Sequence, residues 1–405
     1  MGTGSVQKNT ISRQTIGNWL IMAGIFVITT LEWHFFDWYQ TFTRFGTLIT
    51  FFCLAGAFFC YQNVKDALKD KLFWLMAVTD IIALVNLFIL GSNKGCLLII
   101  VDFMLILYLS DKIDFTRRQT FVFLAYTAFF FFYWTIDVKG YFKGYNTNYG
   151  GLILITGFAA LMIIMQVFNG ELVEKYYALT AEFGKAEGRR GFIKRFFYYP
   201  VVYLFFIALA FNIISWYRSR TALMGLLALL AIIIIPRKVV MNKYVYNMIC
   251  VVATVGSVAF SGIYILLGQI GDGGMQLFYK DIISGRNRIW NELWRAFLEK
   301  PLTGIGSSYV MKLDFMEGML EAHSAMMDIL VIHGVIVFIP VCGLLLYRLI
   351  KLRNVFEKST LGKTVFAAVI CILITGFFEN YYIVQPFSLI LLTILCIKPE
   401  RISDI

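Results

Sequence analysis

Charged residues are scarce in this sequence, and their scarcity excludes an ordinary soluble domain. Asp, Glu, Lys and Arg make up 15% of the 405 residues, against 59% for hydrophobic residues. Soluble globular domains carry about 25% charged residues. Proline is also rare, with 6 residues, while 32 glycines allow helices to pack closely. The composition predicts a polytopic membrane protein built from packed helices.

The sequence also lacks the residue patterns of metal sites. Its 7 cysteines lie in or at the edges of hydrophobic segments without metal-ligand spacing, so we expect them to be packing residues. The polar segment 268–323 contains no Asp-x-Asp or other tight carboxylate pair that would hold a divalent cation between phosphates. We therefore predict a site with no metal and no cofactor. Because no small-residue cleavage site follows the first apolar run, that run is expected to be a retained helix.

Long apolar segments are abundant. They recur almost end to end at the length of membrane-spanning helices, roughly 17 to 25 residues, which favours an all-α bundle over a β-barrel. We find no internal repeat and no linker, so residues 1–405 are predicted to form a single integral membrane domain with about 12 spans. The predicted spans are 15–31, 42–61, 72–90, 95–109, 120–136, 151–168, 198–214, 221–235, 245–267, 324–347, 363–378 and 381–397.

The net charge of +11 does not indicate nucleic acid binding, because the basic residues fall between apolar spans. They occupy alternate connections, which the positive-inside rule places in the cytoplasm. Both termini then lie in the cytoplasm, whereas segments 215–220 and 268–323 face outward, the latter between spans nine and ten. The predicted cytoplasmic residues are Lys8, Arg13, Lys65, Lys69, Lys71, Lys112, Arg117, Arg118, Lys175, Lys185, Arg189, Arg190, Lys194, Arg195, Arg237, Lys238, Lys243, Arg348, Lys351, Arg353, Lys358, Lys398 and Arg401.

An amphipathic helix is predicted inside segment 268–323. Apolar residues recur there at helical spacing, with polar residues on the opposite face, and Pro301 prevents continuation. A helix of this kind suits the outer leaflet or a position capping the bundle. Its apolar positions are Trp290, Leu293, Trp294, Phe297 and Leu298.

Two arginine clusters fall in the predicted external compartment. Arg218 and Arg220 precede the apolar run 221–235, and Arg286 and Arg288 precede the amphipathic helix. Arg218 and Arg220 alone could be a snorkelling flank of a membrane helix. Together they favour an anionic ligand, because a guanidinium keeps its charge and binds a diphosphate through a planar pair of donors.

His323 is the candidate general base, because imidazole titrates nearest to the working pH. The alternative is a polar residue that only satisfies hydrogen bonds at a helix entrance. Gly304 and Gly306 do not form a nucleotide-binding motif, because no strand precedes them, and they are expected to make a sharp turn back toward the membrane. Asp80 and Asp102, inside apolar spans, leave an ion-coupled transporter as the alternative class.

Several motifs follow one another in the C-terminal half of the chain. They are Ser219-Arg220-Thr221-Ala222-Leu223, Gly285-Arg286-x-x-x-Trp290, Pro301-Leu302-x-Gly304-x-Gly306, and Ala322-His323-Ser324 before a long apolar run that contains Gly334. In this order and in the predicted external compartment, they resemble the O-antigen ligase and polymerase family.

This resemblance implies a GT-C-type membrane glycosyltransferase in the bacterial cytoplasmic (inner) membrane. Such an enzyme takes a glycan from undecaprenyl diphosphate at the external face and transfers it, with inversion, to a hydroxyl of a lipid A core or of a lipid-linked oligosaccharide. Carried over to this chain, Arg220 and Arg286 would hold the diphosphate and His323 would activate the acceptor. Further substrate contacts are expected from Arg218, Arg288, Trp290, Gly304 and Gly306. The alternative is a glycolipid flippase or an ion-coupled exporter that uses Asp80 and Asp102.

Overall fold

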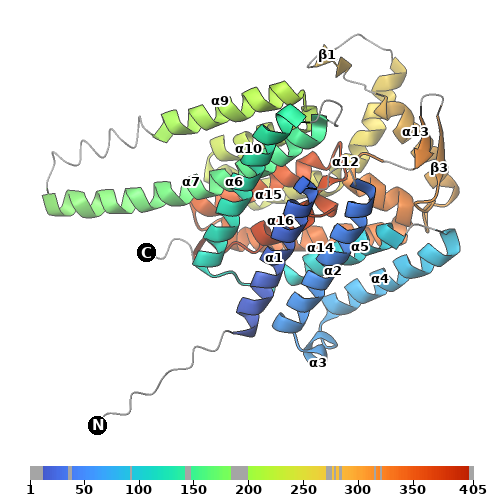
Figure 1. The fold of residues 1–405 in the computed structure, drawn as a ribbon, viewed down its shortest axis with the longest axis horizontal. Coiled ribbons are helices and arrows are strands. Elements are labelled where there is room, and N and C mark those ends of the chain that lie inside the picture. Colours follow the sequence, from blue (N-terminus) through green and yellow to red (C-terminus); the bar gives the residue numbers. More distant parts are fainter. Residues whose placement is uncertain are drawn as a thin grey trace.

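The computed structural model describes residues 12–34, 39–91, 94–141, 147–183, 199–270, 276–277, 280–281, 285–313, 316–319 and 322–400. A helix lies on each predicted apolar span within these residues (Figure 1). The predicted basic loop from 185 to 195 and the chain ends with Lys8 and Arg401 lie outside them. The helices on the spans are α1 (Arg13–His34), α2 (Tyr39–Tyr61), α4 (Lys71–Leu90), α5 (Lys94–Leu109), α6 (Arg117–Tyr141), α7 (Thr147–Phe183), α9 (Tyr199–Tyr217), α10 (Arg220–Ile234), α12 (Lys243–Ile270), α14 (Ala325–Phe356), α15 (Thr360–Thr375) and α16 (Phe387–Leu395).

Five helices in the described residues are long and apolar enough to cross a membrane. They are found in α1, α4, α7, α12 and α14, and shorter apolar helices occupy parts of α2, α5, α9, α10 and α15. The chain is therefore an all-α, multi-pass membrane protein. The count of about 12 crossings and the GT-C type stay predictions.

Local sequence signals explain where several helices begin and end. Asp70 caps α4 by accepting a hydrogen bond from the backbone N–H of Leu72 at 2.9 Å, and Gly91 ends this helix in the left-handed region at φ 64°. Ser219 caps α10 through its side chain in the same way. Short polar or glycine-containing breaks between apolar runs thus fix the helix boundaries.

The last helices form the centre of the bundle. α15 is buried along nearly its whole length, and α16 is buried throughout. The predicted last span begins later than expected, because Tyr381–Ile383 form a 3-10 turn (η3) before Pro386 and α16. The segment between α15 and α16 is therefore held in the interior.

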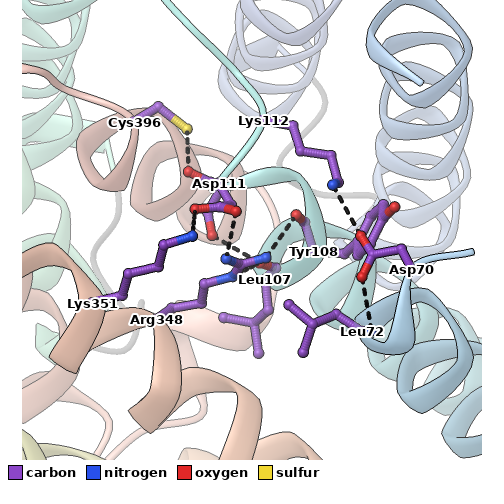
Figure 2. A network of polar contacts seen from close by, with 10 residues as sticks. Asp70, Leu72, Leu107, Tyr108, Asp111, Lys112, Arg348, Lys351 and Cys396 are labelled. Carbon is purple, nitrogen blue, oxygen red and sulfur yellow. Dashed lines mark hydrogen bonds and ion pairs between the residues drawn. The ribbon is translucent and has the colours of Figure 1, made fainter. Parts of the chain in front are cut away.

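Several basic connections meet at one end of the bundle, here named the basic end. Lys112 pairs with Asp70 at 3.0 Å, and Asp111 pairs with Arg348 at 3.1 Å and with Lys351 at 2.7 Å (Figure 2). The connections after α2 and α5 and the last turns of α14 therefore lie together. The grouping agrees with the predicted alternation of loops, whereas the assignment of this end to the cytoplasm stays a prediction.

The described part of segment 268–323 contains the predicted amphipathic helix as α13 (Arg286–Glu299). Two small antiparallel hairpins accompany it, β1 (Gln276–Leu277) with β2 (Lys280–Asp281), and β3 (Val310–Leu313) with β4 (Met316–Met319). Trp290, Leu293 and Phe297 are buried against α12 and α14, while Leu298 is exposed. The apolar face of α13 thus packs on α12 and α14, whereas its position relative to the outer leaflet stays a prediction.

A break in α14 receives the segment that follows α13. Gly334 interrupts the helix at φ 75° and ψ 176°. The backbone of Pro301–Gly306 runs beside the break and pairs with it, through Val335 N to Pro301 O at 2.9 Å and Ile305 N to Val331 O at 2.9 Å. The break therefore satisfies its freed backbone groups by binding a second segment.

Candidate active site

Arg286, His323 and Glu379 form one contact cluster, here named the Glu379 cluster. Arg286 Nη2 donates to Glu379 Oε1 at 2.6 Å, and His323 Nδ1 lies 3.2 Å from Glu379 Oε2. Arg286 is 8% exposed and Glu379 is 9% exposed, whereas the His323 side chain is 23% exposed. Two residues predicted to act together are thus joined through a carboxylate between them.

Glu379 is missing from the residues predicted from the sequence. It lies in the short break between the last two apolar runs, next to Phe378 and Asn380, neither of which carries a charge that would mark it. The one available signal is that Glu379 is an acidic residue between two apolar runs, in a connection that the predicted topology places on the external side. Its position is fixed by the end of α15, where Phe377 N bonds Ile374 O at 3.1 Å.

Trp290 ties the first residue of α13 to the segment before α14. Arg286 and Trp290 lie four residues apart, on the same face of the helix. The indole Nε1 donates to Ala322 O at 2.7 Å, and the ring packs against Tyr264 and Phe378 with centroids at 5.0 and 6.4 Å. The Gly-Arg-x-x-x-Trp motif therefore positions His323, the neighbour of Ala322. Direct contact between Trp290 and a substrate stays a prediction.

His323 has an unusual backbone conformation. Its φ is 48°, in the left-handed region that few residues other than glycine adopt. Contacts on both sides hold it there, because Ala322 O accepts from Trp290 and Ala325 N donates to Gly376 O at 2.9 Å. This conformation turns the imidazole toward Glu379 at the entrance of α14.

One polar group of the cluster and one at the start of α14 are not satisfied within the described residues. Arg286 Nε and Ser324 Oγ are buried without a hydrogen-bond partner there. The guanidinium of Arg286 lies 5.6 Å from the centroid of the Phe378 ring. Buried polar groups usually find a partner, so the Nε donor of Arg286 suits an oxygen-rich ligand beside Glu379.

Arg220 lies at the same end of α15 as the Glu379 cluster. α10 runs antiparallel to α15. The first part of α10 lies beside the end of α15, since a Cβ on Gly225 would lie 3.1 Å from Thr375, and the end of α10 lies beside the start of α15, since Lys363 Nζ donates to Ile233 O at 2.6 Å. The first turn of α10, which carries Arg220, therefore lies near the C-terminal end of α15, and Glu379 comes shortly after that end in the sequence. Arg218, with φ 51°, directly precedes this turn.

Arg288 and the two glycines differ from Arg286 in their surroundings. Arg288 is exposed and lies two residues along α13, on another face of the helix than buried Arg286. Gly304 and Gly306 have φ of 77° and 75°, in the left-handed region that favours glycine, whereas a sharp turn back toward the membrane stays a prediction. A Cβ on Gly304 would lie 2.4 Å from Ile332 O, so this glycine is required for docking onto α14. A substrate contact of either glycine stays a prediction.

No group of three or more His, Cys, Asp or Glu side chains that could hold a metal ion occurs in the part of the chain that the structure describes. The cluster contains one carboxylate and one imidazole, with a guanidinium beside them. A carboxylate, an imidazole and a guanidinium in contact are suited to proton transfer and to binding an anion.

The family described as O-antigen ligase matches this chain over residues 204–342. A search of curated proteins and a search of solved structures found no match to it. The matched segment contains the motifs around Arg220, Arg286 and His323, and ends before Glu379. The resemblance to the O-antigen ligase and polymerase family is therefore confirmed over residues 204–342.

Proposed function

We propose that this chain is a membrane glycosyltransferase of the O-antigen ligase or polymerase type. It transfers a glycan from undecaprenyl diphosphate to a hydroxyl of an acceptor, either a lipid A core or a lipid-linked oligosaccharide. The observation that carries the proposal is the Glu379 cluster, because the Glu379 carboxylate contacts Arg286 at 2.6 Å through one oxygen and His323 at 3.2 Å through the other. These are two of the residues on which the family resemblance rests.

His323 acts as the general base. When His323 Nδ1–H donates to the Glu379 carboxylate, the lone pair of the imidazole is on Nε2. Nε2 then takes the proton of the acceptor hydroxyl as its oxygen attacks the anomeric carbon. Glu379 is a positioning residue in this step, since it holds the tautomer and the orientation of the ring and stabilises the imidazolium that forms.

The arginines stabilise the leaving diphosphate. A guanidinium has five N–H donors, and Glu379 takes one from Arg286, so the others remain for phosphate oxygens. The bond from the anomeric carbon to the diphosphate oxygen breaks as the bond to the acceptor forms on the opposite face, which inverts the configuration. Arg286 and Arg220 offset the charge that develops on that oxygen, with help from Arg218 and Arg288, so no metal is required.

The site faces the external side of the bacterial inner membrane, with both termini in the cytoplasm. Support comes from the basic end. His323 lies at the start of α14, whereas the basic end includes the last turns of this helix, with Arg348 and Lys351. Basic residues accumulate on the cytoplasmic side of membrane proteins. The polyprenyl chain of the donor would enter sideways between helices.

A transporter is the second candidate function. Asp102 is 2% exposed, and both of its carboxylate oxygens lack a partner among the described residues. A buried carboxyl group in a membrane helix is typical of ion pathways. A flippase or exporter using Asp80 and Asp102 would, however, leave the Glu379 cluster without a role.

The test is transfer by purified protein in detergent with EDTA present. Donor and acceptor are supplied, and release of undecaprenyl diphosphate and growth of the acceptor are measured. His323→Ala should lose about 10²- to 10⁴-fold in turnover while still binding the donor. If the wild type transfers nothing, while Asp102→Asn stops glycolipid movement across vesicles, the transporter is correct.

A further inference from the structure

A basic cavity lies at the basic end, at the opposite end of α14 from His323. It has a volume of about 450 Å³. One wall is the start of α12, and the other is the last turns of α14. The lining residues are Lys243, Asn247, Tyr347, Ile350, Lys351, Arg353 and Asn354. Nothing in the proposed glycosyl transfer uses this cavity.

Hydrogen bonds hold the two walls together. Tyr246 OH donates to Leu349 O at 2.7 Å, and Arg353 Nε donates to Met241 O at 2.9 Å. Each bond joins the region where α12 begins to the last turns of α14. The shape of the cavity is therefore fixed by the packing of these helices.

The cavity carries positive charge that the protein does not fully neutralise. Lys351 pairs with Asp111 at 2.7 Å, as Figure 2 shows, and Arg353 pairs with Glu357 at 2.8 Å. Lys243 has no ion-pair partner within the described residues. Asn247 Oδ1 is buried without a hydrogen-bond partner there. The cavity thus suits an anion that also carries hydroxyl groups.

An apolar surface continues from the cavity toward the middle of the membrane span. On α12, Met248, Val251 and Val252 are exposed beyond the cavity, and Tyr347 and Ile350 on α14, which line it, are exposed beside them. A ligand with its charged group in the cavity would therefore lie beside apolar side chains along the helices. A free phosphate ion would leave this surface unused.

We propose that this cavity binds the head group of an anionic phospholipid of the phosphatidylglycerol kind. The phosphate lies against Lys243, with Lys351 and Arg353 on the other wall, and the glycerol hydroxyls reach Asn247. The acyl chains lie along α12. Basic pockets between membrane helices are suited to such head groups.

Native mass spectrometry of the purified protein in micelles tests the proposal. Phosphatidylglycerol and phosphatidylcholine with identical acyl chains are added in turn. The wild type should retain phosphatidylglycerol preferentially, and Lys243→Gln should bind it about fivefold more weakly. The matched control is Lys238→Gln on α11 (Arg237–Val240), which is also near the start of α12 but does not line the cavity. Its binding should equal that of the wild type.

Other outcomes overturn the proposal. Equal retention of the two lipids would remove any role for the anionic head group. Equal weakening in Lys243→Gln and Lys238→Gln would indicate a general surface charge effect. Displacement of the lipid by millimolar inorganic phosphate, with phosphate itself remaining bound, would identify a free anion as the ligand. Thermal unfolding of both variants checks that they are folded, and the binding readout does not depend on glycosyl transfer.

Discussion

Glu379 contacts both partners of the proposed reaction centre, so its substitution tests how that centre works. Glu379→Gln keeps the shape of the side chain but removes the charge that holds the His323 imidazole, and we expect turnover to fall by about 10²- to 10⁴-fold with little change in donor binding. Combined with His323→Ala, it should add little further loss, because both changes remove one function. Additive losses in this cycle would mean that Glu379 acts without His323. Glu292→Gln, on α13 and bonded to Tyr309 OH at 2.7 Å, is the control that should retain activity.

Arg286 tests the diphosphate contact. Arg286→Lys should be nearly as inactive as Arg286→Ala, because an ammonium cannot bond Glu379 and a phosphate through one planar group. Arg288→Ala, at an exposed position of the same helix, should have a milder effect. Single-turnover rates and donor binding distinguish the variants. Near-normal turnover of Arg286→Lys would show that charge alone is sufficient there.

At the scale of the elements, the break in α14 depends on two glycines, Gly304 and Gly334, whose backbones approach each other closely. A Cβ on Gly334 would lie 2.1 Å from Leu302 O, and the residue has φ 75°, so Gly334→Ala should lower the free energy of unfolding by about 2–5 kcal/mol. Gly343→Ala is a matched control in the same helix, since apart from its chain neighbours and the adjacent backbone of its own helix no atom lies within 4 Å of its Cβ position. It should be neutral or slightly stabilising. Thermal unfolding in detergent measures both, and equal melting temperatures would contradict the prediction.

At the scale of the whole molecule, the basic end connects helices that are distant in the sequence, and its ion pairs depend on pH. Burial raises the pKa of Asp111, but the hydrogen bond from Lys351 and the charge of Arg348 outweigh it, so the pKa lies below its ordinary value. The stability from these pairs is therefore complete above the unfolded carboxyl pKa of about 3.9 and is lost as the pH falls through the lowered value.

Asp111→Asn should consequently destabilise the protein by about 1–3 kcal/mol at neutral pH, since it leaves buried Arg348 without its carboxylate partner. The difference from the wild type should shrink as the pH falls below about 4. Glu357→Gln breaks the more exposed pair with Arg353 and serves as the control, with an expected effect below about 1 kcal/mol. Unfolding curves at several pH values measure both, and a difference that grows in acid would refute the assignment.

The sequence predicts the helices well because length and hydropathy are local properties. The amphipathic helix α13 and the grouping of basic loops follow from spacing and charge in the same way. Glu379 cannot be identified from local spacing or charge, because it lies 93 positions from Arg286 and 56 positions from His323 in the sequence. The break in α14 cannot be predicted locally either, since a glycine such as Gly334 inside an apolar run carries no sign of the segment that pairs with it. The contact of Trp290 with Ala322 requires the folded chain for the same reason.

The Glu379 cluster also sets an order for biosynthesis. A membrane chain is made from its N-terminus, so α13 and α14 leave the ribosome before α15. Until Glu379 follows, Arg286 lacks the carboxylate that neutralises it in the finished protein, and burying a guanidinium without a counter-charge is costly. We therefore expect the burial of Arg286 at the start of α13 to be completed only when the end of α15 is in place.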